Sequence, residues 1–550
     1  MKSLISIFLL AGFFANAQIL NHKKEFNRQD SLRGTNNEFR AWWDVLHYDI
    51  EIEPDFEKQF IKGKTTIAFN VLSEKGGDKM QIDLQEPMQM DAVYLDGILI
   101  NPENITREGN VYFLTMDKKW RLNTKHILEI HFSGNPRLAL NPPWDGGWIF
   151  TKDEKGRPWM SVACQGLGAS VWYPNKDYLG DEPDQGASLS MTVSENLIGI
   201  ANGRLTDMKE VENNKIKFTW EVKNPINNYN IIPYIGHYTV IKDHFEGEKG
   251  TLDLEYWVLD YNREKAEAQF KQTHDMLKSF EHWFGPYPFY EDGFKLVEAP
   301  HLGMEHQSAI AYGNGFQNGY LGTDLSDSGW GLKWDFILIH ESGHEWFGNN
   351  ITNKDVADMW IHEGFTAYSE TLHTQVLFGK EAGNDYVIGT RKKIQNDIPM
   401  IGVYGMNHEG SSDIYYKGAN MIHTFRQLLD DDEKFRQILR GLNAQFRHQT
   451  VTSREIEDYM SKMSGIDLTE FFNQYLRTTQ IPTLEYKIQG NQITYRWTNI
   501  VDKFDMPVRV SDSDHWLFPG AEWKVETLDA DTAANFKIDR NFYISSQEVK

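Results

Sequence analysis

The chain has 550 residues but only one cysteine, Cys164. A single cysteine excludes an intramolecular disulfide, so the folded state depends on packed cores and on any bound metal. Basic residues are also few, because 56 lysines and arginines stand against 79 aspartates and glutamates and leave a formal net charge of -23. Nucleic acid and anionic membrane surfaces require a net basic face, so neither is predicted as a partner.

After the first 17 residues, no segment is apolar over the roughly 20 residues that a membrane-spanning helix needs. The first 17 residues themselves combine Lys2, an apolar run over 4–14 and the small triplet Ala-Asn-Ala at 15–17. This order is typical of a secretory signal peptide. We therefore expect export to a periplasm or to the extracellular space, with Gln18 as the first residue of the mature chain.

Aromatic residues are abundant, with 17 Trp, 24 Tyr and 32 Phe, which indicates a globular chain. Single cores seldom grow past about 250–300 residues, so several domains are expected. The alternation of apolar and polar residues predicts strands up to about 247, helical spacing follows to about 480, and alternation then returns. We predict a multidomain α+β protein, divided into a signal peptide over 1–17, a polar linker over 18–40, an antiparallel β domain over 41–247, a largely helical domain over 248–480 and a β module over 481–550.

The change from strands to helices is clearest in residues 263–284. Ala266, Phe270 and Leu277 stand at helical spacing in this stretch, which predicts one helix that Pro286 terminates.

The most informative motif is His340-Glu341-Ser342-Gly343-His344. Residues i and i+4 of a helix share one face, so His340 and His344 can bind one metal ion. Glu363 follows after 18 further residues and supplies a carboxylate as third ligand. Three protein ligands leave one position of a tetrahedral zinc ion open, as in catalytic rather than structural sites. We therefore predict one Zn²⁺ per chain.

Glu341 lies one position after the first ligand, so its side chain is expected beside the metal rather than on it. Zinc lowers the pKa of a bound water toward about 7, and a carboxylate in this place suits a general base that transfers the proton of that water to the leaving amine. Gly343 supports the assignment, because glycine inside a helix costs about 1 kcal/mol relative to alanine and implies close packing behind the metal.

This motif and its surroundings resemble the gluzincin zinc aminopeptidase family, which includes aminopeptidase N and the leukotriene hydrolase branch. The stretch after His344 is similar to the family's H-Q-W-F-G-N, and residues 360–365 are similar to its W-x-N-E-G-F. The resemblance implies an N-terminal β saddle domain, a thermolysin-like catalytic domain over 248–480 and a small C-terminal β-sandwich over 481–550.

The family's exopeptidase motif, G-x-M-E-N, is similar to residues 302–306, where Met304 and Glu305 keep its core and His306 replaces asparagine. The resemblance implies that Glu305 binds the free α-amine of a peptide, with Met304 and His306 beside it in the substrate site. Gln165 matches a family position that helps to hold the same amine.

Two further residues take roles from the resemblance. Tyr415, in a stretch similar to the family's Y-x-K-G, is expected to donate a hydrogen bond to the oxyanion of the tetrahedral intermediate. Glu370 lies two helical turns after Glu363 and matches a family carboxylate that orients a zinc-binding imidazole. The neighbouring Tyr416 and the lone Cys164 are expected to be packing residues.

The function predicted from these residues is a zinc metallo-aminopeptidase acting on peptides with a free N-terminus. Three alternatives use the same metal site: a thermolysin-like endopeptidase, which would cleave N-blocked peptides; an epoxide hydrolase; and an inactive zinc-bearing binding protein. Retention of the base, the ligands and Tyr415 disfavours the inactive protein.

Overall fold

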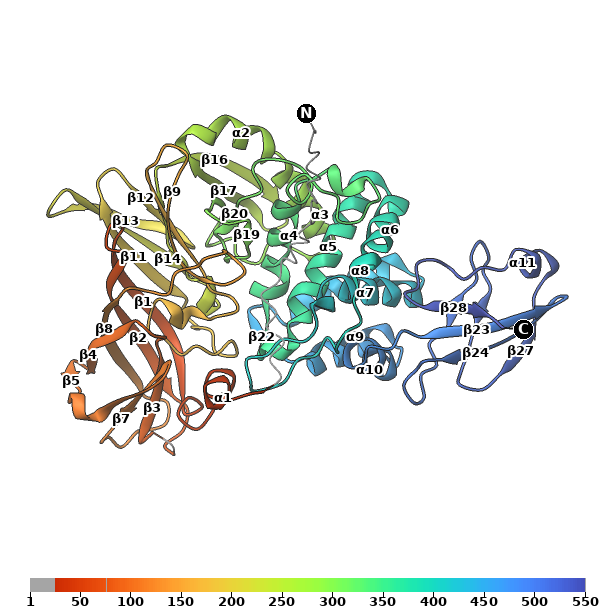
Figure 1. Cartoon of the computed structure of the whole chain (residues 1–550), viewed down its shortest axis with the longest axis horizontal. Helices are drawn as coiled ribbons and strands as arrows, with labels where there is room; N and C mark the ends of the chain where they lie inside the picture. The colour runs from red at the N-terminus through yellow and green to blue at the C-terminus, as the bar shows by residue number, and fades with distance from the viewer. Residues whose placement is uncertain (1–24, 76, 550) are drawn as a thin grey trace, which may run out of the picture.

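The computed structural model describes residues 25–75 and 77–549, so the predicted signal peptide lies outside the described residues. Three regions follow one another along the longest axis (Figure 1): strands at the N-terminal end, a helical region in the middle and a small sheet at the C-terminal end. The predicted multidomain α+β fold class is confirmed. No helix in the described ranges is long and apolar enough to cross a membrane.

The N-terminal domain is built almost entirely of strands. Their bounds are β1 Trp43–Asp55, β2 Phe60–Val71, β3 Lys79–Asp83, β4 Gln89–Leu95, β5 Ile98–Leu99, β6 Ile105–Glu108, β7 Val111–Thr115, β8 Lys125–Gly134, β9 Gly147–Lys152, β10 Pro158–Ala163, β11 Ala187–Ser194, β12 Ile198–Ile200, β13 Arg204–Val211, β14 Lys215–Val222 and β15 Tyr234–Gly236.

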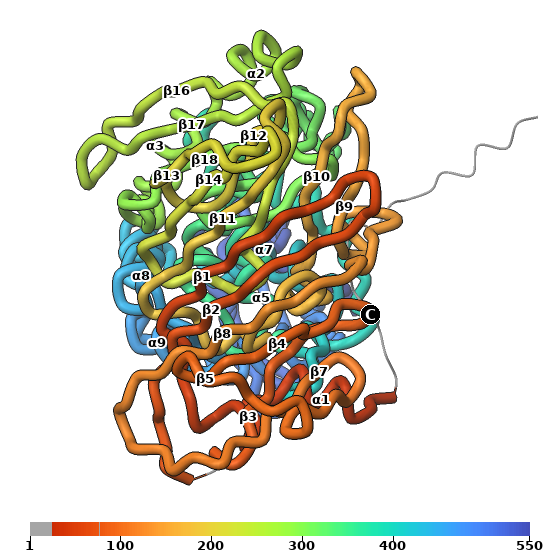
Figure 2. Tube along the Cα trace, turned by 90° about the vertical axis from the view of Figure 1, so that its left-hand side faces the viewer, coloured from red at the N-terminus to blue at the C-terminus, as the bar shows by residue number. Residues whose placement is uncertain are grey.

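An eight-stranded sheet in the order β13-β14-β11-β1-β2-β8-β4-β5 forms the outer layer of this domain (Figure 2). Its pairs are antiparallel except β1 with β11, which run parallel with Tyr48 opposite Ala187. Buried and half-buried residues alternate along most of β1 because successive side chains of a strand point to opposite faces. A four-stranded sheet, β12-β15-β10-β9, belongs to the same domain, and its strand β10 ends two residues before Gln165.

The polar segment before β1 is not the featureless linker that its composition predicts. It contains a helix, α1 (Arg28–Gly34), which begins at a capping box formed by Asn27 and Asp30. Arg40 is fully buried and pairs with Asp83 of the β domain, and the Thr35 hydroxyl donates to the Gly405 carbonyl of the helical domain at 2.9 Å. Such a short helix leaves no apolar period in the sequence, so only the capping box signals it.

The middle region joins a five-stranded sheet, β16-β17-β18-β20-β19, and a two-stranded sheet, β21-β22, to a group of helices. Its strands are β16 Tyr238–Gly247, β17 Gly250–Leu259, β18 Phe294–Glu298, β19 Gly303–Met304, β20 Ile310–Tyr312, β21 Ile351–Asn353 and β22 Gln449–Val451, and its α-helices are α2 Arg263–Gln269, α3 Gln272–Phe284, α4 Phe336–Gly343, α5 Trp360–Phe378, α6 Lys380–Gly389, α7 Tyr416–Leu429, α8 Asp432–Gln445, α9 Ser453–Ser464 and α10 Thr469–Arg477.

Two predicted bounds change in this region. β16 pairs with β17 throughout its length, so the sheet begins at Tyr238 rather than at the predicted 248. The single helix predicted over 263–284 is divided into α2 and α3, because Phe270 leaves helical geometry with ψ near 0°. Its buried ring packs against Tyr256 and Tyr312, and this packing fixes the break.

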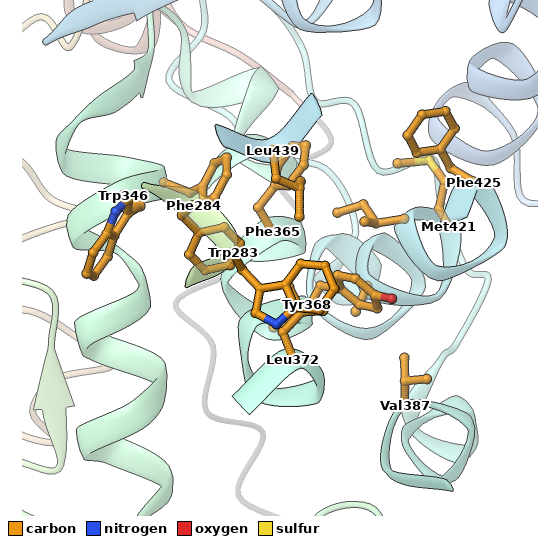
Figure 3. Packing of buried hydrophobic residues seen from close by; sticks show 14 of the residues in the cluster. Trp283, Phe284, Trp346, Phe365, Tyr368, Leu372, Val387, Met421, Phe425 and Leu439 are labelled. Carbon is orange, nitrogen blue, oxygen red and sulfur yellow. The ribbon is translucent and has the colours of Figure 1, made fainter. Parts of the chain in front are cut away.

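Helix α5 is the centre of the domain, since every residue from Trp360 to Thr374 is buried. Figure 3 shows Phe365, Tyr368 and Leu372 of α5 among aromatic and aliphatic side chains from α3, α7 and α8. Ionisable residues within such a helix have no water to solvate them, which makes them candidates for a functional site.

The C-terminal region forms a four-stranded sheet, β27-β24-β23-β28, and a two-stranded one, β25-β26. The bounds are β23 Thr483–Gln489, β24 Gln492–Thr498, β25 Val508–Arg509, β26 Trp516–Leu517, β27 Lys524–Thr527, α11 Ala530–Ala534 and β28 Ser545–Glu548. The region shares one hydrophobic core with the helices, and the Tyr475 hydroxyl of α10 donates to the Tyr543 carbonyl at 2.8 Å.

Candidate active site

Helix α4 presents the first two histidines of the motif. The Asp335 carboxylate caps its N-terminus by accepting from the Leu338 amide at 3.2 Å, as N-cap residues do. His340 lies inside the helix and His344 at its end, with ring centroids 5.0 Å apart. The i, i+4 spacing therefore places both rings on one side of α4.

Helix α5 brings Glu363 to the two rings. Its Oε2 atom lies 3.5 Å from His340 Nε2 and 3.3 Å from His344 Nε2. The close approach of α4 and α5 depends on Gly343, since a Cβ there would lie 2.6 Å from the Ser369 hydroxyl of α5. The packing expected behind this glycine is thus present.

The outer nitrogens of both imidazoles have other partners. His340 Nδ1 lies 2.7 Å from Glu370 Oε1, and the other oxygen of Glu370 accepts from the Tyr386 hydroxyl at 2.6 Å. His344 Nδ1 lies 3.0 Å from the Phe347 carbonyl. Both Nε2 atoms are thereby turned toward Glu363, the arrangement that outer hydrogen bonds impose on zinc-binding histidines.

These three side chains fit a zinc ion. One ligand atom from each of His340, His344 and Glu363 lies within 4.8 Å of the others, and all three residues are buried. Glu363 Oε2 has no hydrogen-bond partner among the described residues, although it is shielded from water. An unpaired buried carboxylate oxygen facing two imidazole nitrogens is a donor set that zinc satisfies.

Burial and charge set the ionisation of the nearby carboxyl groups. Burial raises the pKa of Glu341 to about 7, with the carboxylates of Glu305 and Glu363 adding to the shift. Burial also favours the neutral form of Glu363, but the nearby imidazoles of His344 and His340 outweigh it and hold the pKa of Glu363 below its ordinary range. Glu363 is therefore an anion, as a metal ligand must be.

Glu305 lies beside the HExxH residues and is only 3 % exposed. Its Oε1 atom accepts from Gln165 Nε2 at 2.6 Å and from the Tyr229 hydroxyl at 2.8 Å. Ligand atoms of Glu305, Glu341 and His344 also lie within 4.8 Å of one another. Burial raises the pKa of Glu305 above its ordinary value, and its carboxyl group is held next to the proposed base.

A pocket opens onto these groups. It is lined by Gln165, Met304, Glu305, His340, Glu341, His344, Glu363 and Tyr415, all singled out from the sequence, and by an apolar wall of Leu302, Tyr320, Leu325, Phe336 and Ile337. Gly303 also lines the pocket, and a Cβ there would come within 2.8 Å of Glu341 Oε1. Only glycine lets β19 approach the base this closely.

His306 does not line the pocket, in contrast to its predicted place in the substrate site. It is fully buried, and its Nδ1 lies 2.5 Å from the hydroxyl of Tyr234 in β15. The tyrosine therefore holds the imidazole at the boundary between the two domains, outside the lining of the pocket. Glu370 also lies outside the pocket, behind His340.

Tyr415 lies at the start of α7, and its ring stacks on that of His340 with centroids 6.0 Å apart. Burial, followed by the Glu363 charge, raises the pKa of Tyr415 well above its ordinary value, so the hydroxyl keeps the proton that a hydrogen-bond donor needs. Tyr416, expected to be a packing residue, also lines the pocket. Cys164 is buried, as expected for a packing residue.

Besides the apolar wall, Tyr229 and Lys393 are residues at the site that were not found from the sequence. Tyr229 donates to Glu305 from a buried turn of the N-terminal domain and belongs to no motif in the sequence. Lys393 lines the pocket from the segment that follows α6; it follows Arg391 and Lys392, a run of three cations that the sequence does show.

A buried His-His-Glu set on two packed helices, with a base between the histidines and a pocket beside them, defines a zinc metallopeptidase of the gluzincin class. Comparison with known families agrees. Residues 269–475 match the peptidase family M1 domain, and residues 45–229 match the peptidase M1 N-terminal domain. The chain belongs to the M1 peptidase family, so the family predicted from the motifs is confirmed.

Individual relatives are distant. The chain is 25% identical to leukotriene A-4 hydrolase of Xenopus laevis over 445 residues, which cover 76% of this chain and 68% of the relative. It is 21% identical to aminopeptidase 2 of Candida albicans over 471 residues, 81% of this chain but about half (48%) of that relative. A Deinococcus radiodurans M1 zinc metallopeptidase variant, solved with a Tyr-Ser-Ala substrate, shares the fold with a TM-score of 0.67 at 19% identity, covering 80% of this chain and 96% of that one.

Proposed function

We propose that the protein is a zinc-dependent aminopeptidase that removes the N-terminal residue from peptides. The observation that carries this proposal is the place of Glu305, a buried carboxylate beside Glu341 and His344. A carboxylate is the natural partner of a peptide's free ammonium group. Bound there, the ammonium would leave room for only one residue before the scissile bond.

The side chains divide the work of the reaction. Gln165 and Tyr229 each donate a hydrogen bond to Glu305 Oε1 and fix its position, and the carboxylate would then bind the substrate ammonium. Glu341 would accept a proton from the attacking water and deliver it to the leaving amine, which is the task of a general base placed beside the metal ligands. The Tyr415 hydroxyl donates to the oxyanion that develops at the scissile carbonyl.

His340, His344 and Glu363 would hold the zinc ion. When bound, zinc supplies a Lewis acid that polarises the carbonyl group and makes water a stronger nucleophile. Glu370 keeps His340 in the tautomer whose Nε2 is free to bind the metal.

Purified protein with one set of peptides, each supplied free and N-acetylated and each assayed with and without chelator, tests this function. We expect loss of single residues from the free peptides only, and loss of that activity with chelator. Equal cleavage of acetylated peptides would establish an endopeptidase instead. Turnover of an epoxide with little peptide cleavage would favour an epoxide hydrolase, and metal binding without turnover would leave a binding protein.

A further inference from the structure

Three consecutive cations, Arg391, Lys392 and Lys393, end the 3-10 helix Thr390–Lys393 that follows α6. The first two are already bound. Arg391 donates to the Asn420 side chain at 2.7 Å and to the Arg540 carbonyl at 2.8 Å, and Lys392 pairs with Asp327. For Lys393, no carboxylate lies within ion-pair distance over residues 25–75 and 77–549.

Lys393 is also the one lysine or arginine among the described residues that line the active-site pocket. The other charged groups there are Glu305, Glu341 and Glu363, and each of these carboxylates has a role in the proposed reaction. The pocket therefore presents an ammonium group that the protein itself does not neutralise. A strongly hydrated point charge on a flexible stem suits a carboxylate that arrives with a ligand.

The segment that carries Lys393 is held firmly in place. The Asp413 carboxylate, 2 % exposed, accepts from the amides of Gln395 and Asn396 at 2.8 and 2.6 Å. The Gln395 side chain donates to the Ser412 hydroxyl at 3.0 Å. Asp413 belongs to the turn that leads directly to Tyr415, so Lys393 and Gln395 reach the pocket from the Tyr415 side.

The position of the amine determines which substrate carboxylate can meet this lysine. With the ammonium at Glu305 and the scissile carbonyl between Glu341 and Tyr415, the residues after the scissile bond must extend away from Glu305. We infer that Lys393 binds a carboxylate on the leaving side of the scissile bond, either the free C-terminus of a short peptide or an acidic side chain. This inference rests on the proposed aminopeptidase function and adds a substrate class to it.

Three pairs of peptides distinguish the possible positions of this substrate carboxylate: the C-terminus, the second side chain and the first side chain. Ala-Phe-Ala is compared with its amide, Ala-Glu-Ala-amide with Ala-Gln-Ala-amide, and Glu-Phe-Ala-amide with Gln-Phe-Ala-amide, each on the full zinc-loaded protein. We expect the charged member of the first or second pair to have a kcat/KM about tenfold higher. A tenfold preference corresponds to the lower end of the range for a hydrogen bond to a charged group. We expect the lower end because Lys393 is partly exposed.

Variants locate the effect. Lys393→Gln should abolish the preference, Lys393→Arg should retain it, and Lys392→Gln, which changes the adjacent exposed cation outside the pocket, should leave it intact. A preference below about twofold in the first two pairs, a preference that survives Lys393→Gln, or an effect confined to the third pair would overturn the inference while the aminopeptidase stands. Absence of chelator-sensitive release from every peptide would overturn the proposed function, and this inference with it.

Discussion

Replacing Glu370 by glutamine tests how the zinc site is built. Glu370 is 1 % exposed and joins two donors, His340 Nδ1 at 2.7 Å and the Tyr386 hydroxyl at 2.6 Å. An amide has almost the same shape as a carboxylate but no charge and only one acceptor oxygen. If the oxygen of the new glutamine accepts from the His340 imidazole, the Tyr386 hydroxyl can rotate to accept from the glutamine NH2 group. The fold should therefore survive, while the imidazole loses an anionic partner.

The expected loss is in metal affinity. Changes to the partners of zinc-binding histidines weaken the metal about 10- to 100-fold, or roughly 1.4–2.7 kcal/mol. Because the imidazole–carboxylate contact of Glu370 is short and shielded from water, we expect Glu370→Gln near the middle of this range. Tyr386→Phe is the matched control: it removes the hydroxyl from the other oxygen of Glu370 and leaves the His340 contact, so its effect should stay below about tenfold.

Competition with a fluorescent zinc chelator of known affinity, at fixed pH and salt, measures the effect directly. Thermal unfolding of the metal-free proteins shows whether the variants remain folded. An affinity within about twofold of the wild type for folded Glu370→Gln would refute the role assigned to Glu370. An equal loss in Tyr386→Phe would show that the pair, rather than the charge on Glu370, orients the histidine.

The remaining predictions concern catalysis and stability. Glu341→Gln should lower kcat about 10²- to 10⁴-fold in peptide assays while zinc content by metal analysis stays at one per chain, because the base is not a ligand. Gly343→Ala should lower the free energy of unfolding in denaturant titrations by about 1–3 kcal/mol, since its Cβ overlaps a hydroxyl of α5. Arg40→Met removes the ion-pair partner of the buried Asp83 and should lower the free energy of unfolding by about 3–5 kcal/mol. Tyr229→Phe should raise KM for free-amine peptides about tenfold with a smaller change in kcat, since it removes one of two side-chain hydrogen bonds to Glu305, the carboxylate proposed to bind the amine.

The zinc ligands could be predicted because their geometry is local. His340 and His344 lie one helical turn apart, so the sequence alone places them on one face. Glu363 could be predicted as the third ligand from its residue type and its spacing after His344. The β domain likewise follows from strand alternation, which reports one buried face wherever a sheet covers a core. Each of these signals lies in a short stretch of chain.

Predictions weakened where contacts join distant segments. Glu305 and Tyr229 are 76 residues apart, and no periodic pattern connects them. His306 occupies the motif position of an asparagine, yet Tyr234, 72 residues earlier, holds its ring outside the pocket. β16 pairs with β17 of the helical domain. Its alternation of apolar and polar residues would be the same if it paired with a strand of the N-terminal domain, so the sequence does not show to which domain it belongs.

The site therefore consists of two parts with different origins. The metal ligands come from two adjacent helices of one domain, whereas the side-chain partners of Glu305, which are Gln165 and Tyr229, come from the other. The Glu305 carbonyl accepts from Asn349 at 2.8 Å, and Asn349 in turn accepts from Asn230 of the N-terminal domain at 2.6 Å. On the proposed function, hydrolysis would be carried out by groups of the helical domain, whereas selection for a free N-terminus would depend on the interface and on the two domains remaining docked.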